Sequence, residues 1–128
     1  MKTWIFSFLF LIIIANMPSQ TILEEKYQLL VKPFVEAVVN NDREKIADLI
    51  YYPLNRQYPI PPIHHKQEMI ERYDQIFDET LINEIKNSSV ETDWHAVGWR
   101  GIMFKSGLVW IDYDGSIIGI NYQTNPGP

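Results

Sequence analysis

Apolar residues follow two different periods along the chain, with helical spacing in the earlier part and alternation in the later part. Apolar side chains recur at helical spacing from Ile22 to Asn40 and again from His64 to Phe77, which predicts amphipathic helices there. Because proline removes a backbone donor, Pro33 predicts a kink or a fresh helix start inside the first helix. Shorter helices are expected after Asn41 and after Asp78, each of which would act as an N-cap.

A proline-rich segment separates these helices. Residues 55–63 read NRQYPIPPI, and prolines at this density exclude a central strand. The segment is therefore expected to form an edge strand or a wrapping loop, and a polyproline recognition motif is the functional alternative.

The stretch from Trp94 to Tyr122 carries the strand signals. Lys105-Ser106-Gly107 and Tyr113-Asp114-Gly115 each place a glycine where a three-residue hairpin loop needs a positive φ. These turns predict three short antiparallel strands. Residues 90–96 alternate apolar and polar side chains and would lead into the first strand through a bulge at Gly98.

The turn geometry also predicts a register. Centring the first loop on Ser106 places Arg100 opposite Asp112, which would form a cross-strand ion pair. A two-residue loop would shift the pairing by one residue and oppose Gly101 to Asp112, so the ion pair favours the first register. The preferred register pairs Phe104 with Leu108, Ile102 with Trp110, Trp110 with Ile118, and Leu108 with Ile120.

In this register both faces of the sheet are apolar, so each needs a cover. Helices of the same chain are expected to cover one face, and a second subunit or another protein the other. The first face would carry Ile102, Phe104, Leu108, Trp110, Ile118 and Ile120. The second face, a possible homodimer interface, would carry Trp99, Met103, Val109, Ile111 and Ile117.

The N-terminal residues have the form of a secretory signal. Met1-Lys2-Thr3 precedes an unbroken apolar run from Trp4 to Ala15, which is too short to span a bilayer comfortably. We expect a signal peptide over residues 1–20, one domain over residues 21–122 and a flexible tail over residues 123–128, with an uncleaved anchor as the alternative. The protein would then be periplasmic or secreted, without stable membrane insertion after cleavage.

Composition narrows the partners. The chain has 128 residues, no cysteine and a net charge of −5, with acidic groups dispersed along it. A disulfide framework is therefore excluded, and the domain must be stabilised by its core alone. No stripe of Lys and Arg alternates with aromatic residues, so nucleic acid is not expected as a partner.

Helices followed by a run of antiparallel strands are typical of the α+β class. Four stretches, YYPLNRQYPI, HKQEMIERYDQIFDE, GWRGIMF and GLVWIDYDGSIIGIN, resemble small exported bacterial proteins of the NTF2-like (cystatin-like) superfamily whose function is unassigned. The resemblance covers roughly residues 23–122. It implies N-terminal helices packed in a strongly curved antiparallel sheet, with a cavity at the mouth of the resulting cone. The superfamily holds both enzymes and binding modules, so the fold alone does not decide the function.

Several residues are candidates for a pocket. Arg100 beside Asp112 could bind a ligand carboxylate, or the two could form a structural ion pair. His95 could act as a general base, or it could be structural. Tyr73 and Trp110 could line a ligand cavity, although core packing explains most aromatic residues of such a domain.

Metal, cofactor and catalytic motifs are not found in the sequence. His64 and Glu68 are four residues apart on a predicted helix, but a zinc site needs three or four ligands and no other His or Cys pattern supplies them. There is no phosphate-binding glycine loop, no G-x-S-x-G and no nucleophilic cysteine. We therefore predict no metal site and no cofactor, and assign no catalytic residue.

These features favour an exported, non-catalytic NTF2-like domain that binds a protein or a small ligand at the cone mouth or the outer sheet face. One alternative is a small cofactor-free lyase, isomerase or hydrolase that uses Asp112, His95 and a tyrosine. Another is an inhibitor or immunity protein against a toxin or lytic enzyme, since an acidic inhibitor suits a basic target.

Overall fold

The computed structural model describes residues 21–122. The predicted signal peptide, residues 1–20, and the predicted tail, residues 123–128, lie outside the described residues. Helices α2 to α6 precede a four-stranded antiparallel sheet, and this order confirms the α+β class. Within residues 21–122, no helix is long and apolar enough to cross a membrane.

The longest described helix, α2, spans Glu25–Val39 and packs against the core through one face. The helix continues through Pro33, so the predicted alternative of a fresh helix start at this residue was wrong. Its buried residues follow helical spacing, which is why an amphipathic helix was predictable. They are Val31, Phe34, Ala37 and Val38.

Helix α3 spans Arg43–Leu49, and its N-cap is Asp42. The Asp42 carboxylate accepts a hydrogen bond from the Lys45 backbone N at 3.1 Å. The prediction that Asn41 caps this helix was wrong. Asn41 has a φ of +52°, a left-handed conformation that asparagine tolerates better than most residues, and it forms the turn before the cap.

The predicted helix from His64 to Phe77 is divided in two. Helix α4 spans Lys66–Glu71 and helix α5 spans Tyr73–Ile76, with Arg72 between them. Helix α6 spans Glu79–Lys86, and the Asp78 carboxylate accepts a hydrogen bond from Leu81 N at 2.9 Å. The predicted N-cap at Asp78 is therefore confirmed.

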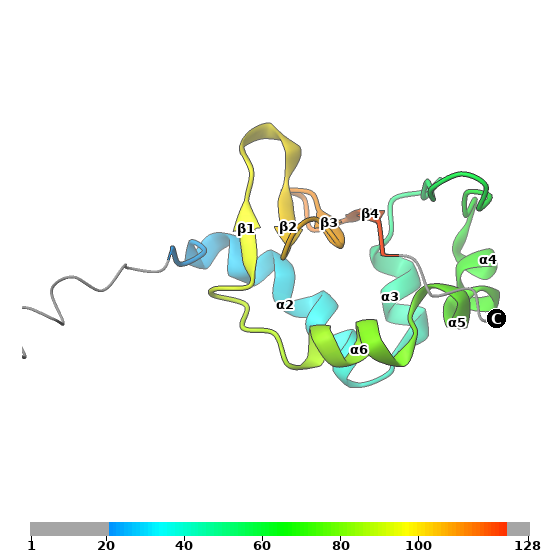
Figure 1. Ribbon diagram of the computed structural model, residues 1–128, viewed down its shortest axis with the longest axis horizontal. Helices are drawn as coiled ribbons and strands as arrows, with labels where there is room; N and C mark the ends of the chain where they lie inside the picture. The colour runs from blue at the N-terminus through cyan, green and yellow to red at the C-terminus, as the bar shows by residue number, and fades with distance from the viewer. Residues whose placement is uncertain (1–20, 123–128) are drawn as a thin grey trace, which may run out of the picture.

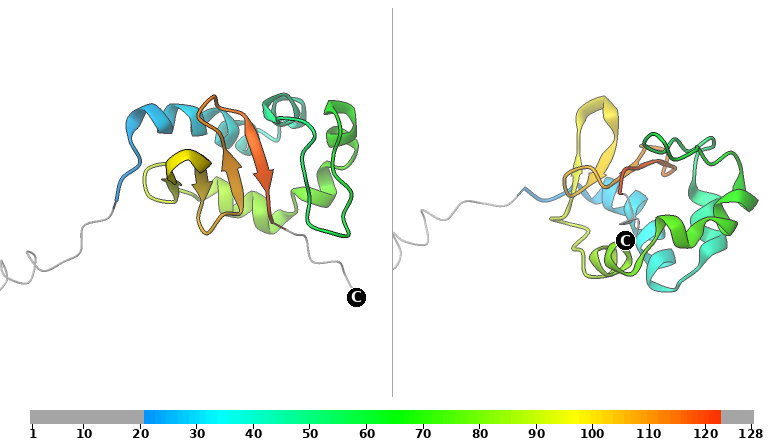
Figure 2. Two further views of the ribbon diagram at one scale, coloured as in Figure 1. Left: turned by 90° about the horizontal axis from the view of Figure 1, so that it is seen from above. Right: turned by 45° about the vertical axis from the view of Figure 1, so that its right-hand side comes forward.

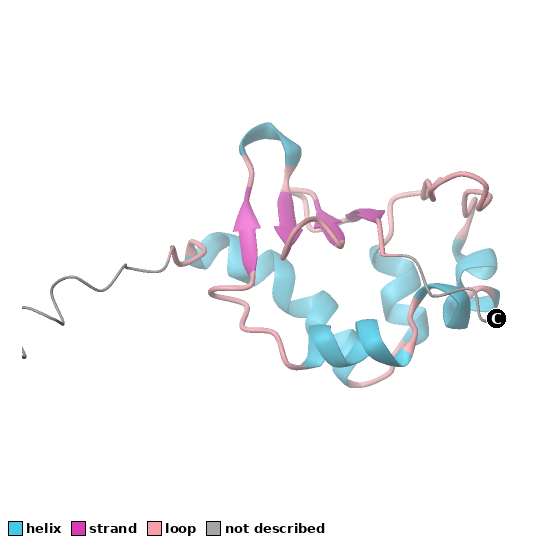
Figure 3. Cartoon of the chain, viewed as in Figure 1, coloured by secondary structure: helices cyan, strands magenta, loops and turns pink. Residues whose placement is uncertain are grey.

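The sheet is a meander of β1 (Trp94–Ala96), β2 (Ile102–Phe104), β3 (Val109–Ile111) and β4 (Ile117–Ile120), in that order. Helices α2 and α6 lie on one side of it, and α3, α4 and α5 gather at the end beyond β4 (Figures 1 and 2). A 3₁₀ turn, η1 (Gly98–Arg100), forms the tip of the β1–β2 hairpin. This tip stands away from the helices (Figure 3).

The register of the β2–β3 hairpin differs from the preferred prediction. Phe104 pairs with Val109 and Ile102 with Ile111, which is the one-residue shift that the two-residue loop would give. The loop adopts it with positive φ at both Lys105 and Gly107. An exposed ion pair contributes little to stability, whereas this register fully buries Val109 and Ile111 on the helix side.

A bulge between Trp110 and Ile111 then adjusts the β3–β4 pairing. Ile111 lies opposite Ile117, but Val109 lies opposite Ile120, so Ile117 and Ile120 both face the core although they are three residues apart. The predicted faces were therefore right for β2 and for Ile120 but wrong for β3, Ile117 and Ile118. The inner face carries Trp94, Ile102, Phe104, Val109, Ile111, Ile117 and Ile120, each at most 1% exposed.

The two edges of the sheet differ. At the β4 edge, Ile50 forms an isolated parallel bridge with Ile117, and Tyr51 N donates to Ile117 O at 2.9 Å. Residues 51–65 then wrap as a loop held by an antiparallel bridge between Leu54 and Ile63, as the proline content predicted. The other edge of the sheet is formed by β1.

Candidate functional site

A cavity of about 490 Å³ lies beside the edge strand β1. One wall is formed by the segment that enters helix α2, and the other by β1 and the residues before it. This volume lies within the range typical of ligand pockets, roughly 300–1,000 Å³. The lining residues are Thr21, Ile22, Leu23, Glu24, Tyr27, Thr92, Asp93, Trp94, His95 and Ala96. We refer to this cavity as the β1 groove.

The hydrogen bonds of the β1–β2 hairpin show which backbone groups face the β1 groove. Lys105 N donates to Asp93 O at 2.8 Å, and Val97 N donates to Gly101 O at 2.8 Å. In an antiparallel pair such residues alternate with residues whose polar groups point the other way. The N–H and C=O groups of Trp94 and Ala96 therefore point away from β2, toward the open edge.

The charged lining of the β1 groove is acidic. Glu24 and Asp93 line it, and its lining contains no Lys or Arg. The Asp93 carboxylate also accepts a hydrogen bond from Ser89 N at 2.7 Å, which fixes its position. Just outside the lining, Lys26 Nζ lies 3.5 Å from the Glu24 carboxylate, and both side chains are about two-thirds exposed. Such an exposed pair leaves Glu24 available to a ligand.

The hairpin tip next to the groove presents an exposed aromatic side chain. Trp99 is 89% exposed, although it lies in an ordered turn. The Tyr113 hydroxyl donates a hydrogen bond to Gly98 O and so ties the tip to the β3–β4 turn. Arg100 Cζ lies 4.7 Å from the centroid of the Trp110 ring. We refer to η1, which contains Trp99 and Arg100, as the hairpin tip.

The pocket residues predicted from the sequence do not form one site. Ile102 pairs with Ile111, so the next position, opposite Asp112, falls to Gly101 instead of Arg100. The Asp112 carboxylate accepts a hydrogen bond from Tyr113 N at 2.8 Å. The predicted Arg100–Asp112 pairing was therefore wrong. Tyr73 is 1% exposed, and its ring centroid lies 4.9 Å from that of Phe77. Burial raises the pKa of the Tyr73 phenol.

His95 is the predicted pocket residue that lines the β1 groove. It lies opposite Met103, which in turn lies opposite Trp110, so these three side chains form a row across the outer face of the sheet. His95 and Trp110 are both half-buried on that face.

The predicted dimer surface is also divided by the corrected register. Val109, Ile111 and Ile117 are each 0% exposed and belong to the core, so they cannot form an outer face. Met103 is half-buried on the outer face, and Trp99 lies at the hairpin tip. The homodimer itself stays a prediction, but not through this set of five residues.

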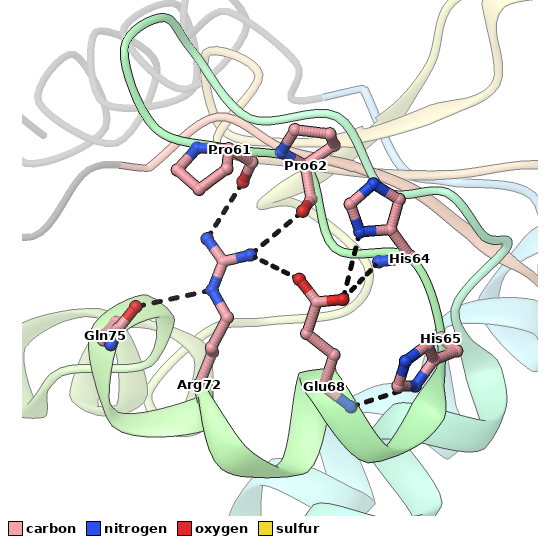
Figure 4. Close-up of polar contacts among 7 residues, drawn as sticks. All are labelled: Pro61, Pro62, His64, His65, Glu68, Arg72 and Gln75. Atoms are coloured by element: carbon pink, nitrogen blue, oxygen red, sulfur yellow. Dashed lines mark hydrogen bonds and ion pairs between the residues drawn. The ribbon is translucent and has the colours of Figure 1, made fainter.

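Apart from the β1 groove, a cluster of polar side chains holds the proline-rich loop to helix α4 (Figure 4). Arg72 Nη2 donates to Pro61 O at 2.9 Å, and Arg72 Nη1 donates to Pro62 O and to the Glu68 carboxylate, both at 3.0 Å. The other Glu68 oxygen accepts from His64 N at 3.2 Å and lies 3.1 Å from His64 Nδ1. The pKa of Glu68 is lowered, most strongly by the hydrogen bond with the His64 side chain. The hydrogen bonds from the His64 backbone and from Arg72 lower it further.

This cluster explains the spacing of His64 and Glu68 without a metal ion. His65 is the N-cap of α4, because its Nδ1 accepts a hydrogen bond from Glu68 N at 3.3 Å. Within residues 21–122, no group of three or more His, Cys, Asp or Glu side chains is placed to hold a metal ion.

Arg56 belongs to the same loop, and its guanidinium is incompletely hydrogen-bonded. Its Nη2 donates to Tyr122 O at 3.0 Å, whereas its Nε and Nη1 are buried with no hydrogen-bond partner. Burial, and then the nearby charge of Arg72, lower the pKa of the Arg56 guanidinium. The arrangement joins the loop to the end of β4.

The β1 groove was not predicted from the sequence as a site. Its strand was expected, and a strand that comes first in a meander is an edge strand unless another segment covers it. That signal was available, but the position of the segment 21–24 across from β1 depends on tertiary packing.

Comparison with known proteins adds no family: no family model, no curated protein and no solved structure gives a significant match to the chain.

Proposed function

We propose that the chain is an exported, non-catalytic binding domain that contacts a protein partner through the hairpin tip. We also propose that its fold is the NTF2-like arrangement, in which helices pack in a curved sheet. Two features support this finer fold: α2 and α6 lie on one side of the sheet (Figure 1), and the β3–β4 pairing contains a bulge, a feature that bends strands.

The exposure of Trp99 carries the functional proposal. A tryptophan side chain buries a large apolar area when it enters a partner's pocket, and tryptophan is enriched among the residues that dominate interface energies. Trp99 is 89% exposed at a turn that the Tyr113 hydroxyl fastens to the sheet. An ordered, exposed anchor of this kind loses little conformational freedom on binding.

The arrangement of the acid–base candidates supports binding over catalysis. His95 lies in β1 and Asp112 follows β3, so β2 separates their strands. Adjacent strands are about 4.8 Å apart, which puts the two backbones on the order of 10 Å from each other. Asp112 also directs its carboxylate to the backbone of its own turn.

A pull-down with the full chain as bait tests this function. The wild type should capture a defined protein from an envelope extract, and Trp99→Ala should abolish capture of the same protein. Tyr58→Ala is the matched control, because Tyr58 is 96% exposed on the proline-rich loop, away from the tip. Equal capture by wild type and Trp99→Ala would refute the proposal.

A further inference from the structure

We propose that the β1 groove binds an extended, positively charged peptide segment, which adds to the sheet as a strand beside β1. This inference rests on the proposed function, because it assigns a second contact and a chemical class to the same protein partner. Its site is distinct from the hairpin tip.

The first support is the difference between the two sheet edges. The β4 edge is engaged by Ile50 and Tyr51 through a bridge and a 2.9 Å hydrogen bond to Ile117 O. At the β1 edge, the segment 21–24 lies nearby, but its backbone bond is to a residue that precedes the strand. Leu23 N donates to Glu91 O at 2.8 Å. A groove therefore remains between this segment and the strand itself, and it is wide enough to form the 490 Å³ cavity.

The second support is the direction of the strand's polar groups. The N–H and C=O of Trp94 and Ala96 point into the groove, because the flanking bonds at Asp93 and Val97 point to β2. An extended peptide offers complementary groups at every second residue. Strand addition of this kind supplies affinity through main-chain hydrogen bonds and specificity through alternate side chains.

The third support is the charge of the groove, which selects the occupant. Glu24 and Asp93 line it without any Lys or Arg in the lining, so Lys or Arg side chains at alternate positions of the peptide would be favoured. A second copy of this chain would bring its own Glu24 and Asp93 to the same place. Like charges brought together in this way disfavour self-pairing through β1.

The probe is a short capped peptide of alternating valine and lysine, added to the full chain and followed by calorimetry and amide NMR. We expect saturable binding, with shifted resonances and slowed hydrogen exchange at the amides of Trp94 and Ala96. Two analogues test the mode of binding. N-methylation of alternate amides removes the donors of one peptide edge, and alternating valine and glutamate reverses the charge. Each should weaken binding at least about tenfold, or ~1.4 kcal/mol.

Variants of the protein test the site. Ala96→Pro removes the N–H that faces the groove without removing a bond to β2, and proline is tolerated on edge strands. It should weaken the peptide at least about tenfold, whereas Ala96→Val keeps the N–H and should bind as wild type does. Glu24→Lys alters no hydrogen bond of the sheet and should also weaken the peptide, which tests the site even if Ala96→Pro fails to fold.

Other outcomes would overturn the inference. They are no binding, equal binding of the N-methylated or glutamate peptide, and a concentration-dependent dimer that Ala96→Pro dissociates, which would identify a second copy as the occupant. Trp99→Ala should leave peptide binding unchanged. Loss of peptide binding with Trp99-dependent capture of the partner intact would therefore refute only the groove. Peptide binding without Trp99-dependent capture would refute only the hairpin tip.

Discussion

The guanidinium of Arg100 lies over the indole of Trp110, with Arg100 Cζ 4.7 Å from the ring centroid. The Asp112 carboxylate instead accepts a hydrogen bond from the next backbone N in its own turn. Arg100 therefore takes an aromatic partner from β3 where the sequence suggested an acidic one. A cation over an aromatic ring contributes roughly 0.5–1 kcal/mol at an exposed site.

A double-mutant cycle separates the two pairings. The coupling free energy between Arg100→Ala and Trp110→Ala should be about 0.5–1 kcal/mol, and the coupling between Arg100→Ala and Asp112→Ala should be near zero. Urea unfolding of the single and double variants measures both values. The reverse order of couplings would restore the predicted ion pair.

Gly101 fixes the start of β2, and its replacement should be costly. Its φ is +112°, and an added Cβ would lie 2.7 Å from Ile111 O. Gly101→Ala should therefore lose at least about 1–3 kcal/mol of unfolding free energy from backbone strain, before the clash is counted. Gly98→Ala is the matched control, because Gly98 also has positive φ but nothing lies within 4 Å of its added Cβ. Equal losses in the two variants would show that the close approach to Ile111 is unimportant.

Glu68 should contribute to the acid dependence of stability. Its pKa is lowered in the folded chain by His64 and Arg72, so its favourable contacts are present above the unfolded value of about 4.5. They are lost as the pH falls through the lower, folded pKa. Glu68→Gln should therefore flatten the acid limb of stability against pH in urea unfolding. Glu71→Gln is a control on the same helix, and an identical effect there would remove the special role of Glu68.

Arg56 should be replaceable by an apolar residue at little cost. Arg56→Met loses one hydrogen bond to Tyr122 O but also removes two buried donors without partners. Removing a poorly satisfied buried charge in favour of a residue of similar shape is often neutral or stabilising. We expect a change in unfolding free energy of less than about 1 kcal/mol. A loss of several kcal/mol would show that the guanidinium is better satisfied than these contacts indicate.

The helices could be predicted from the sequence because each depends on local periodicity and capping. The α+β class and the cap at Asp78 are confirmed for this reason. The helix predicted from His64 to Phe77 was harder, because Arg72 turns out of the helix where it reaches the carbonyls of Pro61 and Pro62. Helical periodicity does not encode this competition between the helix and the carbonyl groups of the preceding loop.

The sheet register depended on a balance that alternation cannot resolve. A shift of one residue exchanges the two faces of a strand, and both faces here are apolar. Lys105 adopts a positive φ, which is uncommon for a non-glycine residue, and the bulge after Trp110 brings Ile117 and Ile120 to one face. The register and the bulge decide which side chains share a face of the sheet. The predicted pocket residues are therefore dispersed in the structure, and the β1 groove was not predicted.

The tryptophans of the described chain occupy three different environments. Trp94 is 0% exposed with its indole N–H buried, Trp110 is half-buried beneath Arg100, and Trp99 is 89% exposed. Indole emission shifts to longer wavelength in water, so each ring should give a distinct fluorescence signal. Single-tryptophan variants would then report separately on melting of the interior, on loss of the Arg100 stack and on capture of a partner. The domain thus contains an intrinsic fluorescent probe in its interior, one at the Arg100 contact and one at the proposed partner contact.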